Sequence, residues 1–74
     1  MAINTAELRA EMGRKKMSQA ELARRTNRTK NTINNIVNGN TTCSLELANC
    51  ICDVLNIESG DRRAEIFLSD TSHK

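Results

Sequence analysis

Polar side chains that can pair with the edges of nucleic-acid bases gather in one short stretch of the chain. Four of them are asparagines, at Asn31, Asn34, Asn35 and Asn38. An asparagine amide carries a donor beside an acceptor, so it can pair with N6 and N7 of adenine, while Lys30 can donate to O6 and N7 of guanine. Asparagine is a poor helix former, so its repetition on a helix favours base contact over the alternative of a merely polar, exposed face.

Four of these side chains lie on two successive turns of one predicted helix. Lys30 and Asn31 lie near its start, and Asn34 and Asn35 lie one turn later. The predicted base-contacting residues are Thr29, Lys30, Asn31, Asn34 and Asn35. Thr29 and Thr32 flank the set, and a threonine methyl can pack on the methyl of thymine. We expect Thr32 to contact the nucleic-acid backbone.

The helix that carries this set needs an apolar side and defined ends. Ile33, Ile36 and Val37 fall three and four apart, so they would face inward together. Thr29 can cap the start of the helix. Asn38-Gly39-Asn40 would end it, because glycine readily adopts the left-handed conformation found just beyond a helix.

Another helix is predicted immediately before it. The start signals are a capping box and a hydrophobic staple, formed by Ser18 with Glu21 and by Met17 with Leu22. This helix runs to about Arg25 or Thr26, and Asn27 follows where a tight turn needs a residue that tolerates positive φ. Two short helices joined by a turn are the plan of a helix-turn-helix, here over about residues 18–38, whose second helix enters the major groove of DNA.

Three further helices complete the prediction. A capping box at Asn4 and Glu7 starts one over about residues 5–15, with Ile3, Leu8 and Met12 on its apolar face. Ser44 starts another, which Asn56 stops. Its predicted core stripe is Leu45, Ala48, Ile51, Cys52 and Leu55, and its second apolar edge is Leu47, Cys50 and Val54.

A fifth helix after Ser59-Gly60 would carry Ile66, Phe67 and Leu68 and cover that second edge, within the chain or across a dimer. The predicted fold is therefore all-α, a compact bundle of four or five short helices. Residues 1–68 would form one domain, and residues 69–74 a frayed tail.

Composition excludes several other classes of protein. One aromatic residue, no proline and three glycines in 74 residues argue against a β-sandwich or barrel. No apolar run could span a bilayer and the N-terminus lacks a signal-peptide pattern, so we expect a cytoplasmic protein without membrane partners. The three cysteines, Cys43, Cys50 and Cys52, and the one histidine, His73, suit neither a disulfide nor a zinc site. Without a nucleophile and base pair or a phosphate loop, we expect no enzyme and no cofactor.

Charge is segregated along the chain. Residues 9–30 hold eight basic and two acidic residues, whereas residues 43–61 hold four acidic and no basic ones. A basic first half suits a polyanionic partner. Ordinary solvated helix faces are the alternative explanation.

The same residues resemble the DNA-binding domains of the Cro and lambda-repressor type. The resemblance covers roughly residues 8–57. It rests on Leu8-Arg9, the run from Met17 to Ala23, Thr29, the run from Thr32 to Ile36, Asn38-Gly39, Ser44-Leu45-Glu46, and Val54 to Ile57. It implies a lambda-repressor-like fold and a homodimer that binds a palindromic operator in double-stranded DNA.

The resemblance also implies roles for individual residues. Gln19 is similar in position to a phosphate-contacting glutamine of the family, and Lys30 and Asn31 to its first base readers. Asn34 and Asn35 match the positions at which the family contacts bases deeper in the groove. The backbone-contacting segment after the reading helix corresponds to Asn38, Asn40, Thr41 and Thr42.

Three positions depart from the family pattern. Asn27 replaces the usual turn glycine, Arg28 replaces an apolar residue, and Cys43 replaces a proline. Asparagine tolerates the left-handed region, so the turn is kept. Arg28 either loosens the packing of the turn or contacts a DNA phosphate, and we predict the phosphate contact.

A phage- or prophage-type repressor is the function that these features favour. An antitoxin, the controller protein of a restriction system, and a protein-interaction module on the same fold are the alternatives. The predicted dimer interface comprises Leu47, Val54, Ile66 and Phe67, which could equally belong to the core of a single chain.

Overall fold

Every helix begins after a polar cap. The structure, a computed structural model, describes residues 2–68, so the predicted tail at 69–74 lies outside the described residues. The side chains of five residues each accept a hydrogen bond from the backbone N–H three residues on. These are Asn4, Ser18, Thr29, Ser44 and Ser59. Such caps satisfy N–H groups that a helix start leaves unpaired.

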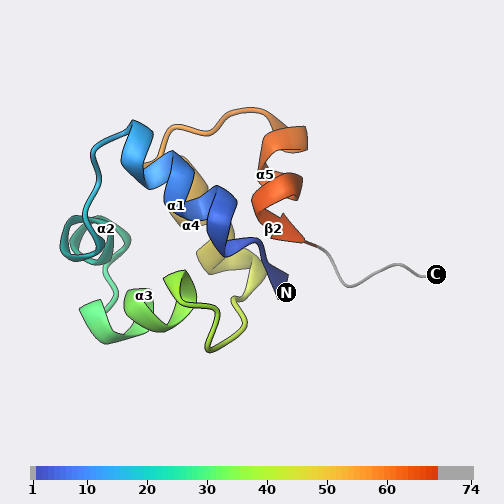
Figure 1. The fold of residues 1–74 in the computed structure, drawn as a ribbon. Coiled ribbons are helices and arrows are strands. Elements are labelled where there is room, and N and C mark those ends of the chain that lie inside the picture. The colour runs from blue at the N-terminus through green and yellow to red at the C-terminus, as the bar shows by residue number, and fades with distance from the viewer. Residues whose placement is uncertain (1, 69–74) are drawn as a thin grey trace.

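The described chain is mostly helical, which confirms the predicted fold class (Figure 1). The helices are α1 (Thr5–Arg14), α2 (Gln19–Thr26), α3 (Lys30–Val37), α4 (Leu45–Val54) and α5 (Gly60–Ile66). Two short strands, β1 (Ala2–Ile3) and β2 (Phe67–Leu68), lie at either end of this helical region.

Three left-handed residues end helices where the sequence indicated a stop. Asn27 has φ 60° after α2, Gly39 has φ 74° after α3, and Asn56 has φ 58° beyond the end of α4. After each of these residues, the next backbone N–H donates to the carbonyl five residues earlier in the chain. An example is the bond of 2.9 Å from Arg28 to Ala23. These bonds satisfy carbonyls that a helix end would otherwise leave exposed.

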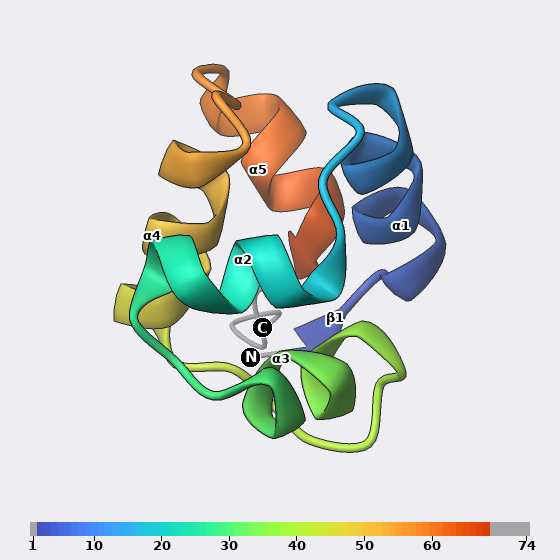
Figure 2. The same cartoon turned by 90° about the vertical axis from the view of Figure 1, so that its left-hand side faces the viewer.

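The helices surround one core, in which α2 packs against α3 and α4 while α1 packs against α3 and α5. Figure 2 shows α2 across the middle of the molecule with α3 below it. The most deeply buried large side chains are Leu8, Leu22, Ile33, Ile36, Ile51, Leu55 and Ile66. Since these come from all five helices, the core fixes the position of α3 relative to the rest.

The two predicted capping boxes form only in part. The N–H of Glu7 donates to Oδ1 of Asn4, but the N–H of Asn4 donates to the carbonyl of Ile66 at 2.7 Å instead of to Glu7. The Glu21 carboxylate likewise binds arginines of its own helix. Each glutamate has a cationic partner that binds a carboxylate more strongly than a backbone N–H does.

The prediction that Phe67 and Leu68 extend the fifth helix is wrong. The helix ends at Ile66, and these two residues pair antiparallel with β1, in the register Ala2 with Leu68 and Ile3 with Phe67. Backbone pairing with a segment more than 60 residues away overrides the local apolar pattern.

Leu45 was wrongly placed in the core stripe of α4. Its side chain is 63% exposed, whereas Ala48, Ile51, Cys52 and Leu55 are buried as predicted. The second edge is largely covered within the chain, because Leu47 is buried and Cys50 and Val54 pack partly buried against the core.

The cysteines are unpaired thiols in the described part of the chain, with Cys43 and Cys52 buried. Burial raises the pKa of both thiols, which keeps them protonated. Among residues 2–68 no group of side chains could hold a metal ion. No helix in this range is long and apolar enough to cross a membrane.

Candidate nucleic-acid interface

One side of α3 is anchored in the core and the other is open. Ile33, Ile36 and Val37 are at most 2% exposed and hold the helix against α1 and α2. In both ribbon views, α3 and the loop that follows it form one end of the molecule (Figures 1 and 2). This placement leaves the polar side of α3 accessible to a large partner.

The structure brings the predicted base-contacting residues together on that open side. Thr29, Lys30, Asn31 and Asn34 are exposed, and Asn35 is half-buried. The Thr29 hydroxyl is already engaged, since it accepts from the N–H of Thr32 at 3.1 Å and lies 2.8 Å from the Thr32 hydroxyl. The two threonines therefore shape the start of α3 as well as bordering the asparagines.

The residues predicted to contact a nucleic-acid backbone border the same surface. Gln19 is the first residue of α2 and is half-buried. Arg28 is exposed and lies 3.9 Å from the carboxylate of Glu46, a separation at which an exposed pair adds little stability. Further along the chain, Asn38, Asn40 and Thr41 lie exposed at the end of α3 and in the loop beyond.

Arg9 belongs to this surface, although the sequence did not reveal its role there. Its guanidinium extends from α1 and donates to Oδ1 of Asn38 at 2.6 Å, across 29 residues of sequence. Nδ2 of Asn38 in turn donates to Oδ1 of Asn34 at 2.6 Å. The spacing of 34 and 38 by four residues was a readable signal for the second bond, but nothing local pointed to the first.

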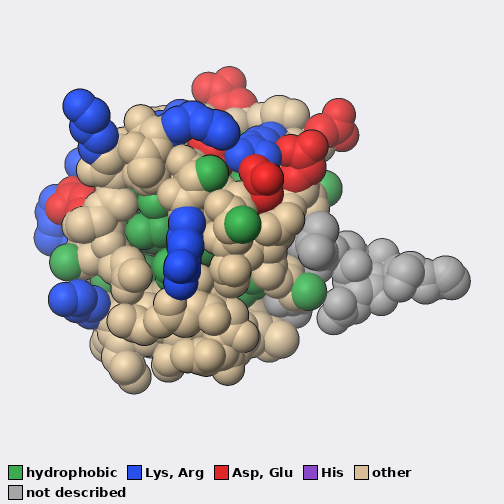
Figure 3. Space-filling view, viewed as in Figure 1, with side chains coloured by type: hydrophobic (Ala, Val, Ile, Leu, Met, Phe, Trp, Pro, Cys, Tyr) green, Lys and Arg blue, Asp and Glu red, His purple; other side chains and the backbone are tan. Residues whose placement is uncertain are grey.

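The surface combines a neutral polar end with positive charge beside it. Figure 3 shows uncharged side chains over the end formed by α3 and its loop, with Lys and Arg side chains above and beside it. Asp and Glu gather mostly at the opposite end in this view. Such a bipolar arrangement orients a molecule toward a polyanion.

Part of the basic charge read from the sequence is neutralised internally. Glu21 binds Arg25 at 2.6 Å and also pairs with Arg24, and these hydrogen bonds lower the pKa of the Glu21 carboxyl. By contrast, within residues 2–68 no carboxylate lies within ion-pair distance of four cations. These are Arg9, Lys15, Lys16 and Lys30.

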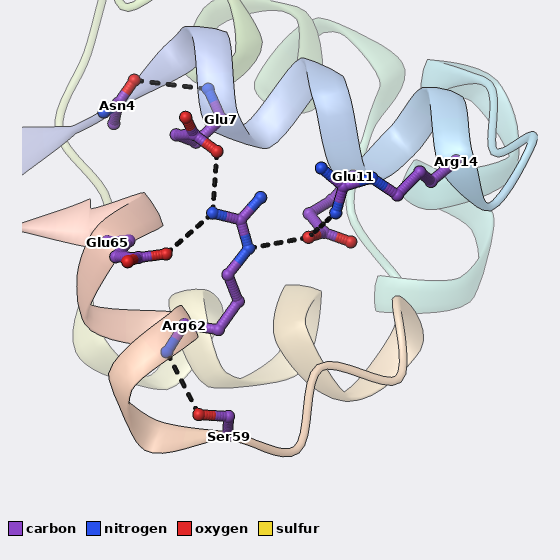
Figure 4. Close-up of polar contacts among 7 residues, drawn as sticks. All are labelled: Asn4, Glu7, Glu11, Arg14, Ser59, Arg62 and Glu65. Carbon is purple, nitrogen blue, oxygen red and sulfur yellow. Dashed lines mark hydrogen bonds and ion pairs between the residues drawn. The ribbon is translucent and has the colours of Figure 1, made fainter.

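An ion-pair network behind the interface holds α1 to α5 (Figure 4). Arg62 on α5 reaches Glu7 at 2.7 Å, Glu11 at 2.7 Å and Glu65 at 2.8 Å. Glu11 is buried, and the hydrogen bond from Arg62, helped by the charge of Arg14, holds the pKa of its carboxyl below the ordinary value. The network steadies α1, which carries Arg9.

Comparison with known proteins supplies an independent finding. The family model of the Cro/C1-type HTH DNA-binding domain matches residues 7–61. This range covers most of α1, all of α2, α3 and α4, and the start of α5, including the whole exposed surface of α3. Neither the curated proteins nor the solved structures yield a match to the chain.

Proposed function

The chain belongs to the Cro/C1-type helix-turn-helix family of DNA-binding domains, and we propose that it is a repressor of transcription that reads operator DNA with α3. The observation that carries the proposal is the two-sided character of α3. Three buried aliphatic side chains fix the helix, while its opposite side presents amides and one lysine. Amides and amines are groups that distinguish base pairs in the major groove.

The proposed contacts follow from position along α3. Thr29, Lys30 and Asn31 meet the first bases, and Asn34 and Asn35 meet bases one turn further on. The proposed backbone contacts come from both sides of the helix, from Gln19, Arg28, Thr32, Asn38, Asn40 and Thr41. Contacts to phosphates set the register of the helix, and the base contacts provide the specificity.

We further propose that the protein acts in the cytoplasm as a homodimer on a palindromic site. A two-fold partner places a second reading helix about 34 Å away, one turn of DNA along the same face. Of the four predicted interface residues, three are buried in the core of the single chain and one is half-buried. The buried ones are Leu47, Ile66 and Phe67, and in this proposal they hold the interface residues in place, while the half-buried Val54 lies beside them.

Leu45 is the most suitable residue for the dimer contact itself. It borders a cavity of about 160 Å³ between α4 and α5, lined mainly by apolar atoms of Ala48, Cys52, Ala64 and Phe67. A cavity of this size is smaller than most small-molecule sites, and it suits an inserted side chain. The same feature favours the second candidate function, an antitoxin or other interaction module that holds a different protein there.

Selection of bound sequences from a random duplex pool tests the proposed function. We expect recovery of one preferred sequence with two-fold symmetry. We also expect the logarithm of the binding constant to fall linearly with the logarithm of the salt concentration, because each neutralised phosphate releases a counterion. A protein that shows no salt-dependent binding to any duplex is not a repressor, and the interaction module would then be the better assignment.

A further inference from the structure

Two amides and one guanidinium form a continuous hydrogen-bonded chain between α1 and α3. Arg9 donates to Oδ1 of Asn38, and Nδ2 of Asn38 donates to Oδ1 of Asn34, with both bonds at 2.6 Å. We refer to these three residues as the amide relay. It ends on Asn34, which belongs to the proposed base-contacting set, and so it bears on how that residue can meet a base.

The relay has a fixed direction because an arginine cannot accept a hydrogen bond. Asn38 must turn its carbonyl oxygen to Arg9, which leaves its NH₂ group to face Asn34. Asn34 must then offer its own carbonyl oxygen to Asn38. The NH₂ group of Asn34 therefore takes no part in the relay, and within residues 2–68 no group accepts a hydrogen bond from it.

We propose that Arg9, acting through Asn38, sets the base preference of Asn34 by fixing it as a hydrogen-bond donor. Paired recognition of adenine needs the oxygen and the NH₂ group of one amide together. Asn38 occupies one of the two lone pairs of the Asn34 oxygen and neither of its NH₂ hydrogens. The paired mode is therefore disfavoured, and Asn34 acts on a base chiefly as a donor, to guanine O6 or N7, thymine O4 or adenine N7. Cytosine is the base it rejects most strongly, because cytosine presents a donor in the major groove.

This inference rests on the proposed function, since it needs α3 to lie in the major groove. Of the asparagines on α3, only Asn34 is affected: single donation to a base replaces the paired recognition of adenine expected for it. Asn31 and Asn35 take no part in the relay, so adenine pairing remains open to them. Arg9 is accordingly a positioning residue that acts on specificity from a neighbouring helix.

Selection from a random duplex pool, run in parallel on the wild type and four variants, tests the proposal. Asn34→Ala identifies the base position that depends on residue 34, because the preference there disappears. At that position the wild type is expected to favour guanine or thymine over cytosine by about fivefold, the lower end of base discrimination by hydrogen bonds. Arg9→Met removes the donor that orients the relay, and the preference should broaden.

Asn38→Asp provides the decisive variant because it is nearly isosteric and reverses the relay. A carboxylate only accepts, so it keeps Arg9 as an ion pair and takes its second hydrogen bond from the NH₂ group of Asn34. Both lone pairs of the Asn34 oxygen are then free while one NH₂ hydrogen is taken, so the preference should move toward the donors that cytosine and adenine present. Asn40→Asp is the matched control, with the same charge change outside the relay, and should weaken binding to all sequences alike.

Wild-type preference for cytosine at this position would overturn the proposal, as would an unchanged preference in Asn38→Asp. The relay can be tested without DNA by using NMR to measure how fast the side-chain amide protons of the free protein exchange with water. We expect slower exchange at Asn38 than at Asn34 in the wild type, and the difference should vanish in Arg9→Met. Equal exchange in the wild type refutes the relay, whereas failure to bind any duplex refutes the proposed function.

Discussion

Asn27 determines the angle between α2 and α3 through its own backbone. It lies in the left-handed region, with φ 60° and ψ 39°, and its N–H closes the end of α2. A β-branched residue is strained in this region, by about 1 to 2 kcal/mol, whereas glycine is not. The turn is therefore a point at which one side chain controls how the reading helix is presented.

We expect Asn27→Val to lower the free energy of unfolding by about 1 to 2 kcal/mol, and Asn27→Gly to leave it nearly unchanged. Urea unfolding followed by circular dichroism measures both. Asn31→Val is the control, because it makes the same exchange at an exposed position with ordinary helical backbone and should cost only a few tenths of a kcal/mol. Equal losses at 27 and 31 would contradict the argument from backbone strain.

Arg28 and Asn35 should separate the two kinds of DNA contact. Arg28→Ala removes a proposed phosphate contact, so binding to all sequences should weaken alike and the salt slope should fall by about one. Asn35→Ala should cost about 1 to 3 kcal/mol on the preferred site and little on random DNA. Binding titrations at several salt concentrations on both duplexes provide the measurement, and identical profiles for the two variants would contradict the assigned roles.

At the scale of the helices and strands, signals within a few residues predicted the structure well. Ser18, Thr29 and Ser44 cap helices as expected, and Asn27 and Asn56 end them, because caps and left-handed stops depend on local hydrogen bonds. The buried side of α3 also followed from spacing alone. These local features sufficed to identify the helix-turn-helix.

Features that depend on distant parts of the chain could not be predicted in this way. Phe67 follows a helical apolar pattern but pairs with Ile3, and Leu45 matches the core spacing but lies at the start of α4, where no other element covers it. Arg9 and Arg62 find partners 29 and 51 residues away. Periodicity records which residues share a face of a helix, and it does not record what lies opposite that face.

The pairing of α1 with α5 makes the stability of the molecule sensitive to acid. The pKa of Glu11 is lowered in the folded state by Arg62, with Arg14 and Lys15 contributing, so the ionised carboxylate stabilises the fold. A lowered pKa gives a contribution that is complete above the ordinary value of 4.5 and is lost as the pH falls through the folded value. Acid should therefore loosen the contact between these helices.

We expect Glu11→Gln to lower the free energy of unfolding at pH 7 by about 1.5 to 3 kcal/mol, the contribution of a hydrogen bond to a charged group. The difference from the wild type should shrink as the pH falls below 4.5. Urea unfolding at pH 7, 5 and 3 measures it. Glu7→Gln is the control, since Glu7 is 41% exposed and should show a smaller effect; a constant difference at all three pH values would contradict the argument.

For the molecule as a whole, the arrangement of charge matters more than its sum. The net charge is only +2, and several arginines are paired with glutamates on their own helices. On the face that Figure 3 shows, the acidic side chains lie mostly away from the end that α3 occupies. A modest total charge distributed in this way still directs one end toward DNA, and two such ends in a dimer would bind cooperatively to one duplex.

The dimer prediction can be tested at Leu45 without disturbing the fold. Leu45 is 63% exposed at the first residue of α4, where a negative charge is favourable, so Leu45→Glu should leave the free energy of unfolding within about 0.5 kcal/mol. A charge there would have to be buried on association, so sedimentation equilibrium should show a monomer where the wild type is a dimer. Affinity for a palindromic duplex should fall, while affinity for a single half-site should not change.

Ala6→Glu serves as the control for Leu45→Glu, because it adds the same charge at an exposed position of α1, away from the cavity between α4 and α5. It should leave the association constant unchanged. Leu47→Ala gives the contrasting result expected of a core residue, a loss of about 2 to 5 kcal/mol in stability, because Leu47 is only 7% exposed. A wild-type protein that remains monomeric at high micromolar concentration would exclude the dimer, and a Leu45→Glu protein that associates as tightly as the wild type would place the interface elsewhere on the surface.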